Sequence, residues 1–173
     1  MRSFAFLPIA AALLAVSGCG YHMLGAAAHL PPGVHTLAVP EFATHTETYR
    51  SETVMTQAVI REFATRTRLR VTPNESEDSD AVLHGTILKE VTAPLTYNTS
   101  TQQSSSFLIT MVVSVTLTSR DGKVLYENKN YVFRQQYQST TNLPTFFEEN
   151  PAAVERLSRE FARQLVADVL EGF

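Results

Sequence analysis

Residues 107–118 carry the most regular hydrophobic pattern in the chain, with an apolar side chain at every second position. This period of two is that of a β-strand whose one face packs against a core. The Asp121-Gly122 pair predicts a hairpin turn, and residues 124–137 then read as the returning strand. A sheet with one strongly apolar face must be covered by another layer. The apolar face is formed by Phe107, Ile109, Met111, Val113, Val115 and Leu117.

Two amphipathic helices are available to cover that face. The first is expected over residues 52–65 with Ser51 as its N-cap, and the second begins at Asn150-Pro151 or one turn earlier at Thr145. Shorter strands are expected at residues 36–40, 69–71 and 81–91, and residues 41–50 are expected to form a polar loop. The predicted fold is therefore α+β: a two-layer sandwich with two helices on one face of a mixed, mostly antiparallel sheet of about four strands.

The N-terminus has the pattern of a secretion signal. Arg2 precedes an apolar stretch, residues 4–16, that is shorter than the roughly 20 residues of a membrane-spanning helix. Val16-Ser17-Gly18-Cys19 resembles the lipobox of bacterial lipoproteins, in which the cysteine is lipidated and becomes the first mature residue. An ordinary signal peptide followed by an unrelated cysteine is the alternative. We expect a signal peptide at 1–18, a lipidated tether at 19–33 and one domain at 34–173.

The sequence contains no catalytic constellation. It has no HExxH or GxSxG motif and no glycine-rich phosphate loop, and its single cysteine excludes an internal disulfide or a multi-thiolate metal site. A formal net charge of −3 argues against nucleic acid as a partner. The acidic run at residues 75–80 reads as a solvated loop, with a Ca²⁺ site as the rarer alternative. We expect a non-enzymatic protein with no metal and no cofactor apart from a covalent lipid on Cys19.

The stretch from Val91 to Ser119 has no charged residue. Its first half, residues 92–106, is rich in Ser, Thr, Gln and Asn and is expected to form an unusually long hairpin loop. This loop is either simply solvated or shaped to enter an uncharged or sugar-rich environment such as a barrel lumen. A second uncharged segment, residues 138–147, is expected near the same end of the sheet. The candidate insertion residues are Tyr97, Asn98, Gln102 and Gln103.

Several ordered motifs resemble one bacterial family. The start of the mature chain, Cys19-Gly20-Tyr21-His22-Met23-Leu24-Gly25, is similar to that of the lipopolysaccharide-assembly lipoproteins of the LptE (RlpB) family. Further similarity lies in residues 30–42, 61–69 and 80–87, in Asp121-Gly122-Lys123 and in the C-terminal helix.

The resemblance implies an outer-membrane lipoprotein that plugs an LptD-type β-barrel, assists the assembly of that barrel and takes part in lipopolysaccharide transport to the cell surface. Gly20, in place of the Asp that retains lipoproteins at the inner membrane, agrees with the outer membrane. An adaptor of another envelope complex is the alternative. Cations expected near strand ends are candidates for lipopolysaccharide phosphates, although a solubility charge is the commoner role for any one such residue; they are Arg68, Arg70, Arg120 and Lys123.

Overall fold

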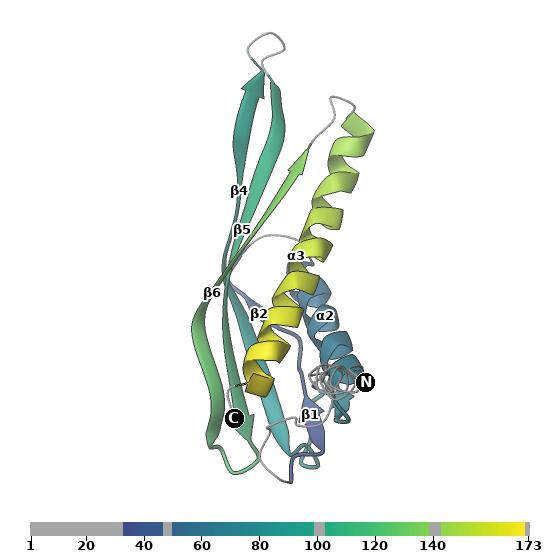
Figure 1. Ribbon diagram of the computed structural model, residues 1–173, viewed down its shortest axis with the longest axis vertical. Coiled ribbons are helices and arrows are strands. Elements are labelled where there is room, and N and C mark those ends of the chain that lie inside the picture. Colours follow the sequence, from purple (N-terminus) through teal and green to yellow (C-terminus); the bar gives the residue numbers. More distant parts are fainter. Residues whose placement is uncertain (1–32, 47–49, 99–102, 139–142, 172–173) are drawn as a thin grey trace, which may run out of the picture.

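A computed structural model describes residues 33–46, 50–98, 103–138 and 143–171, and the elements within them form an elongated two-layer α+β domain (Figure 1). Two helices lie on the same side of one sheet, as the sequence predicted. The strands are β1 (Thr36–Ala38), β2 (Ala43–Thr44), β3 (Arg70–Thr72), β4 (Ala81–Asn98), β5 (Gln103–Ser119) and β6 (Val124–Gln138). The helices are α2 (Ser51–Arg66) and α3 (Leu143–Glu171).

The sheet is mixed and has six strands, more than the four expected. Its order is β3-β1-β4-β5-β6, and the two-residue β2 pairs with β4 beside that path. Strand β1 is parallel to β3 and β4, whereas β4, β5 and β6 are antiparallel to one another. Strand β2 lies within the segment that was expected to be a polar loop.

The alternation in β5 decides which sheet face is covered. Ile109, Met111, Val113, Val115 and Leu117 are all fully buried, and the residues between them are only half-buried. The buried face packs against apolar stripes of the helices, which include Met55, Val59 and Phe63 in α2 and Leu157, Phe161 and Leu165 in α3. The two helices also contact each other, so a single core contains side chains of the sheet, α2 and α3.

The predicted cap of the first helix was wrong. Ser51 is the first residue of α2 and is buried, and the N-cap is Arg50, which has a left-handed backbone with φ of 70° and makes no capping hydrogen bond through its side chain. Ser is a frequent N-cap, but here Ser51 lies one residue inside the helix, where its side chain is buried and does not cap the helix.

The predicted start of the second helix was also wrong. Helix α3 begins at Leu143, so Pro151 lies inside it rather than at its first position. Proline lacks the backbone N–H that an interior helical residue donates, which is why Asn150-Pro151 resembled a helix start.

The long hairpin loop was the largest error of the sequence analysis. Strand β4 runs on to Asn98 and β5 begins at Gln103, so most of residues 92–106 forms paired strand. The register continues through Thr92↔Ile109, Pro94↔Phe107 and Asn98↔Gln103. Strand β6 ends at Gln138 opposite Ser106, which places the first residue of the second uncharged segment at the same end of the sheet, as expected.

Candidate functional site

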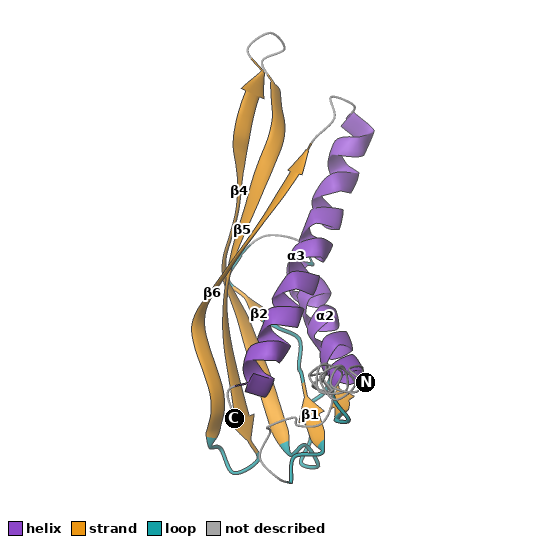
Figure 2. Ribbon diagram, in the orientation of Figure 1, coloured by secondary structure: helices purple, strands orange, loops and turns teal. Residues whose placement is uncertain are grey.

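The distal hairpin, defined as residues 91–98 of β4 and 103–110 of β5, ends in a tip that extends beyond the helices (Figure 2). The pairing of β2 with β4 ends at Ile87, where the backbone N–H of His45 donates to the carbonyl oxygen of Ile87 over 3.0 Å. A register irregularity between Ile87 and Lys89 follows immediately. Within the described residues, the distal part of β4 therefore pairs with β5 alone.

The distal hairpin carries no charged residue, and its β4 side is exposed, whereas Ile109 on its β5 side belongs to the core. Residues 91–96 are exposed without exception, and no charged residue occurs between Val91 and Ser119. Two further irregularities, between Pro94 and Thr96 and between Thr96 and Tyr97, disturb the ladder near the tip. The hydroxyl groups of Thr96 and Ser106 lie 2.7 Å apart across the strands, so the hairpin is held partly by its own polar side chains.

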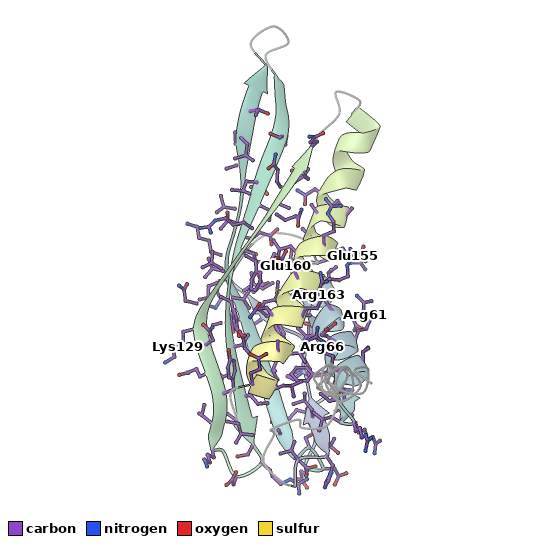
Figure 3. All side chains as sticks on the ribbon, viewed as in Figure 1. Arg61, Arg66, Lys129, Glu155, Glu160 and Arg163 are labelled. Carbon is purple, nitrogen blue, oxygen red and sulfur yellow. The ribbon has the colours of Figure 1, made fainter. Side chains whose placement is uncertain are left out.

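Exposed large apolar side chains are concentrated in this half of the sheet. Val91 lies opposite Thr110 and Val132 lies opposite Val112, both on the face turned away from the helices. Charged residues border this surface, since Lys89 and Glu90 precede Val91 and Arg134 pairs with Thr110. Figure 3 labels further charged side chains over the two helices and on the lower part of β6. The exposed apolar residues here are Leu88, Val91, Leu95 and Val132, each 39–48% exposed.

The four candidate cations lie at the opposite end of the sheet. Arg70 pairs with Thr36 at the start of β1, and Arg120 and Lys123 belong to the turn between β5 and β6. Arg68, Arg70 and Lys123 are exposed. The same end also carries acidic residues, so it is not a purely basic surface; these are Glu75, Glu77, Asp78, Asp80 and Asp121.

Asp80 organises this end through a group of contacts that we call the Asp80 cluster, formed by His35, Thr36, Ser79, Asp80 and Arg120. One carboxylate oxygen, Oδ2, accepts the backbone N–H groups of His35 and Thr36, each over 2.9 Å. The other, Oδ1, lies 3.2 Å from a guanidinium nitrogen of Arg120. The two backbone donors, followed by the charge of Arg120, hold the pKa of Asp80 below its ordinary value. Arg120 is thus partly engaged in structure.

A second polar network fixes α3 to β6. The hydroxyl of Tyr131 donates to Oδ2 of Asp168 over 2.6 Å, and the hydroxyl of Tyr126 contacts that of Tyr131. Gln164 donates to the other oxygen of Asp168 over 2.6 Å. Burial, and then the neighbouring Asp168 and Tyr126, raise the pKa of the Tyr131 phenol. The arrangement suits a structural attachment because Tyr131 is buried beneath the helix.

A shallow hollow of about 450 Å³ lies between α2 and the loops after β1 and β3. It is polar, and one of its two carboxylates, that of Glu41, already accepts a hydrogen bond from Thr53 over 2.6 Å. Within the described ranges, no group of three or more metal-binding side chains comes together. In that same part of the chain, no helix combines the length and apolar character needed to cross a membrane.

The structure separates the two groups of predicted site residues. Tyr97, Asn98 and Gln103 occupy the tip of the distal hairpin, with Tyr97 paired to Ser104 and Asn98 to Gln103, whereas the four cations lie at the other end. Cys19 and Gln102 lie outside the described residues. The Asp80 cluster was missed because its members are far apart in sequence. The strand character of residues 91–97 was signalled by Val91, Thr92, Thr96 and Tyr97, which are residue types that favour strands.

The two-layer fold is shared with structurally known bacterial lipoproteins. A lipoprotein from Caulobacter crescentus superposes with a TM-score of 0.53 at 14% identity, covering 76% of this chain and 89% of that one. Lipoprotein B from Nitrosomonas europaea gives 0.53 at 15% identity, covering 83% and 90%. A minor lipoprotein from Acinetobacter baumannii gives 0.50 at 14% identity, covering 80% and 92%. At these identities the likeness shows the fold alone.

The sequence match is more specific than the structural one. The family model for LptE, lipopolysaccharide assembly, matches residues 34–169. The chain therefore belongs to the LptE family, as its motifs indicated. None of the curated proteins matches the sequence significantly.

Proposed function

We propose that this protein is a non-enzymatic outer-membrane lipoprotein that plugs an LptD-type β-barrel, assists its assembly and takes part in lipopolysaccharide transport. Membership of the lipopolysaccharide-assembly family supports the general role. Lipidation of Cys19 supplies the membrane attachment in this proposal, and residues 20–33 serve as the tether.

The observation that carries the barrel contact is the distal hairpin. A β-hairpin whose tip extends beyond the helices, whose residues 91–96 are exposed and which carries no charged residue is suited to a confined, uncharged surrounding. Exposed apolar side chains such as Val91 and Leu95 add contact area that water does not favour. We therefore assign Tyr97, Asn98, Gln102 and Gln103 to the part that enters the lumen.

Site-specific photo-crosslinking in cells tests this assignment. A photoreactive residue at Tyr97 or Val91 should capture one large barrel protein. Val124 is a matched control because it is also an exposed strand valine, 52% exposed, but lies at the other end of β6. Capture of soluble periplasmic proteins alone from Tyr97 and Val91 would contradict the assignment.

Purification after mild detergent extraction separates this function from the alternative of an adaptor for another envelope complex. The proposal requires one large barrel at equal stoichiometry, and a different envelope partner in its place would favour the alternative.

Lipopolysaccharide contact is assigned to the four cations at the opposite end. Arg68, Arg70 and Lys123 have exposed side chains suited to phosphate groups, while Arg120 would contribute charge from within the Asp80 cluster. Because Arg120 also bonds Asp80, the first test neutralises the other three alone: Arg68→Gln, Arg70→Gln and Lys123→Gln. Unchanged lipopolysaccharide binding by this variant and by one that adds Arg120→Gln would refute the assignment.

A further inference from the structure

The chain enters the described domain through a very short strand. Gly33 and Val34 lead directly into β1, which is only three residues long and lies between β3 and β4. In Figure 1, β1 lies at the end of the sheet opposite the tip of the distal hairpin. Tension applied to the preceding N-terminal segment would reach the fold first at His35 and Thr36.

The Asp80 cluster is concentrated at that point of entry. Besides the two bonds accepted by the Asp80 carboxylate, the backbone N–H of Asp80 donates to the carbonyl oxygen of Thr36 over 3.0 Å. Asp80 thus holds both residues on which an N-terminal pull would act. On the β4 side the ordinary strand pairing, Leu37↔Ala81 and Ala38↔Val82, begins only after them. On the β3 side Thr36 already pairs with Arg70, whose backbone N–H donates to the carbonyl oxygen of His35 over 2.8 Å.

Arg120 extends this attachment to a third part of the sheet. Its Nε donates to the carbonyl oxygen of Ser79 over 3.1 Å, and its backbone N–H donates to the carbonyl oxygen of Asp80 over 2.8 Å. With the ion pair to the carboxylate, the turn between β5 and β6 is bound to the start of β4 by side chain and backbone together. His35 and Thr36 are therefore connected through Asp80 and Arg120 to the β5–β6 turn as well as to β3 and β4, the strands beside β1.

We propose that the Asp80 cluster is a mechanical clamp, which passes tension on the N-terminal segment into β4 and the β5–β6 turn and so prevents β1 from peeling away. A three-residue strand has few hydrogen bonds to resist local opening, and charge-assisted bonds at its first residues raise the cost of that opening. The clamp rests on the proposed lipid anchor only for the source of the tension.

Two measurements on the mature, unlipidated chain test the clamp. In Asp80→Ala, amide hydrogen exchange at His35 and Thr36 should be faster by at least about tenfold, the effect of losing one charge-assisted hydrogen bond. Pulling between the single thiol, at Cys19, and the C-terminus should release β1 at a lower force than in the wild type. Asp78→Ala is the matched control, since Asp78 is an exposed acid of the same loop, and it should change neither result.

Arg120→Gln keeps the Asp80 carboxylate and covers the case in which Asp80→Ala fails to fold; it should also lower the release force. Wild-type exchange at His35 and Thr36, or an unchanged release force, in the folded variants would overturn the clamp. Cys19→Ala with lipid labelling in cells tests the anchor separately. If the lipid label does not depend on Cys19, the proposed anchor is wrong, but the exchange and force results still test the clamp.

Discussion

The ring of Phe42 lies directly over Gly85, in the space that a Cβ atom on Gly85 would occupy. Both residues are buried, and the same ring packs edge-on against Phe161 of α3, with the two ring centroids 6.1 Å apart. Residue 85 is therefore the point at which β4 allows an aromatic side chain from the segment before β2 to reach the second helix.

Gly85→Ala is expected to destabilise the domain by about 1–3 kcal/mol, the usual cost of overpacking a filled core. Denaturant unfolding followed by circular dichroism measures this change. Removing the ring by Phe42→Ala should be destabilising by itself but should abolish most of the additional cost of Gly85→Ala. Equal costs of Gly85→Ala in both backgrounds would show that the contact with Phe42 is not responsible.

Tyr131→Phe is expected to lower the free energy of unfolding by about 1.5–3 kcal/mol at neutral pH, because it removes a hydrogen bond to the Asp168 carboxylate. The raised pKa of Tyr131 also gives a pH dependence. Its ordinary value is 10.0, so the stabilisation is complete below pH 10 and is lost progressively as the pH rises above that value. Unfolding free energies measured between pH 7 and 11 should fall less steeply in Tyr131→Phe than in the wild type.

Asp80→Asn should be less stable than the wild type at neutral pH and should lose that difference in acid. Because the pKa of Asp80 is held below 3.8, its contribution is present above that pH and disappears as the pH falls through the lowered value. The measurement is the free energy of unfolding as a function of acid pH for the wild type, Asp80→Asn and the control variant Asp78→Asn. Parallel curves for the wild type and Asp80→Asn would argue against a carboxylate-specific contribution.

Val91→Asp is expected to leave the domain stable, within about 0.5 kcal/mol, because the side chain is exposed on the distal hairpin. It should nevertheless reduce recovery of the barrel complex by placing a charge within the part of β4 that has none, residues 91–98. Val124→Asp should preserve both stability and complex. The measurement is the amount of barrel protein that co-purifies with each variant, normalised to the amount of that variant in the membrane. Equal recovery with Val91→Asp and Val124→Asp would show that Val91 does not contact the barrel.

The fold class could be derived from the sequence because its main signals are periodic and local. The alternation from Phe107 to Leu117 identified one of the long strands and its buried face, and the α2 stripe at Met55, Val59 and Phe63 identified a covering helix. The distal half of β4 was taken for a loop because Thr92–Ser106 is polar, although exposed strands need no buried face to remain paired when a neighbouring strand supplies the hydrogen bonds.

The contacts between distant segments could not be derived in this way. Nothing in the local sequence links Asp80 to His35 or Arg120, and nothing links Tyr131 to Asp168. Such pairs depend on strand order and on the crossing of α3 over β6, which a single sequence does not specify. Arg120 shows the consequence: a cation assigned only to ligand contact also forms part of the structure.

The length of the two long strands, β4 and β5, sets how far the hairpin tip lies from the other end of the domain. Strand β5 has 17 residues, and at about 3.3 Å per residue it measures roughly 55 Å, nearly twice the ~30 Å hydrocarbon thickness of a bilayer. The height of the hairpin tip above the point where the chain enters is consequently fixed by a count of residues. Removing two residues from each of β4 and β5 would lower the tip by roughly 7 Å while every remaining side chain kept its face of the sheet.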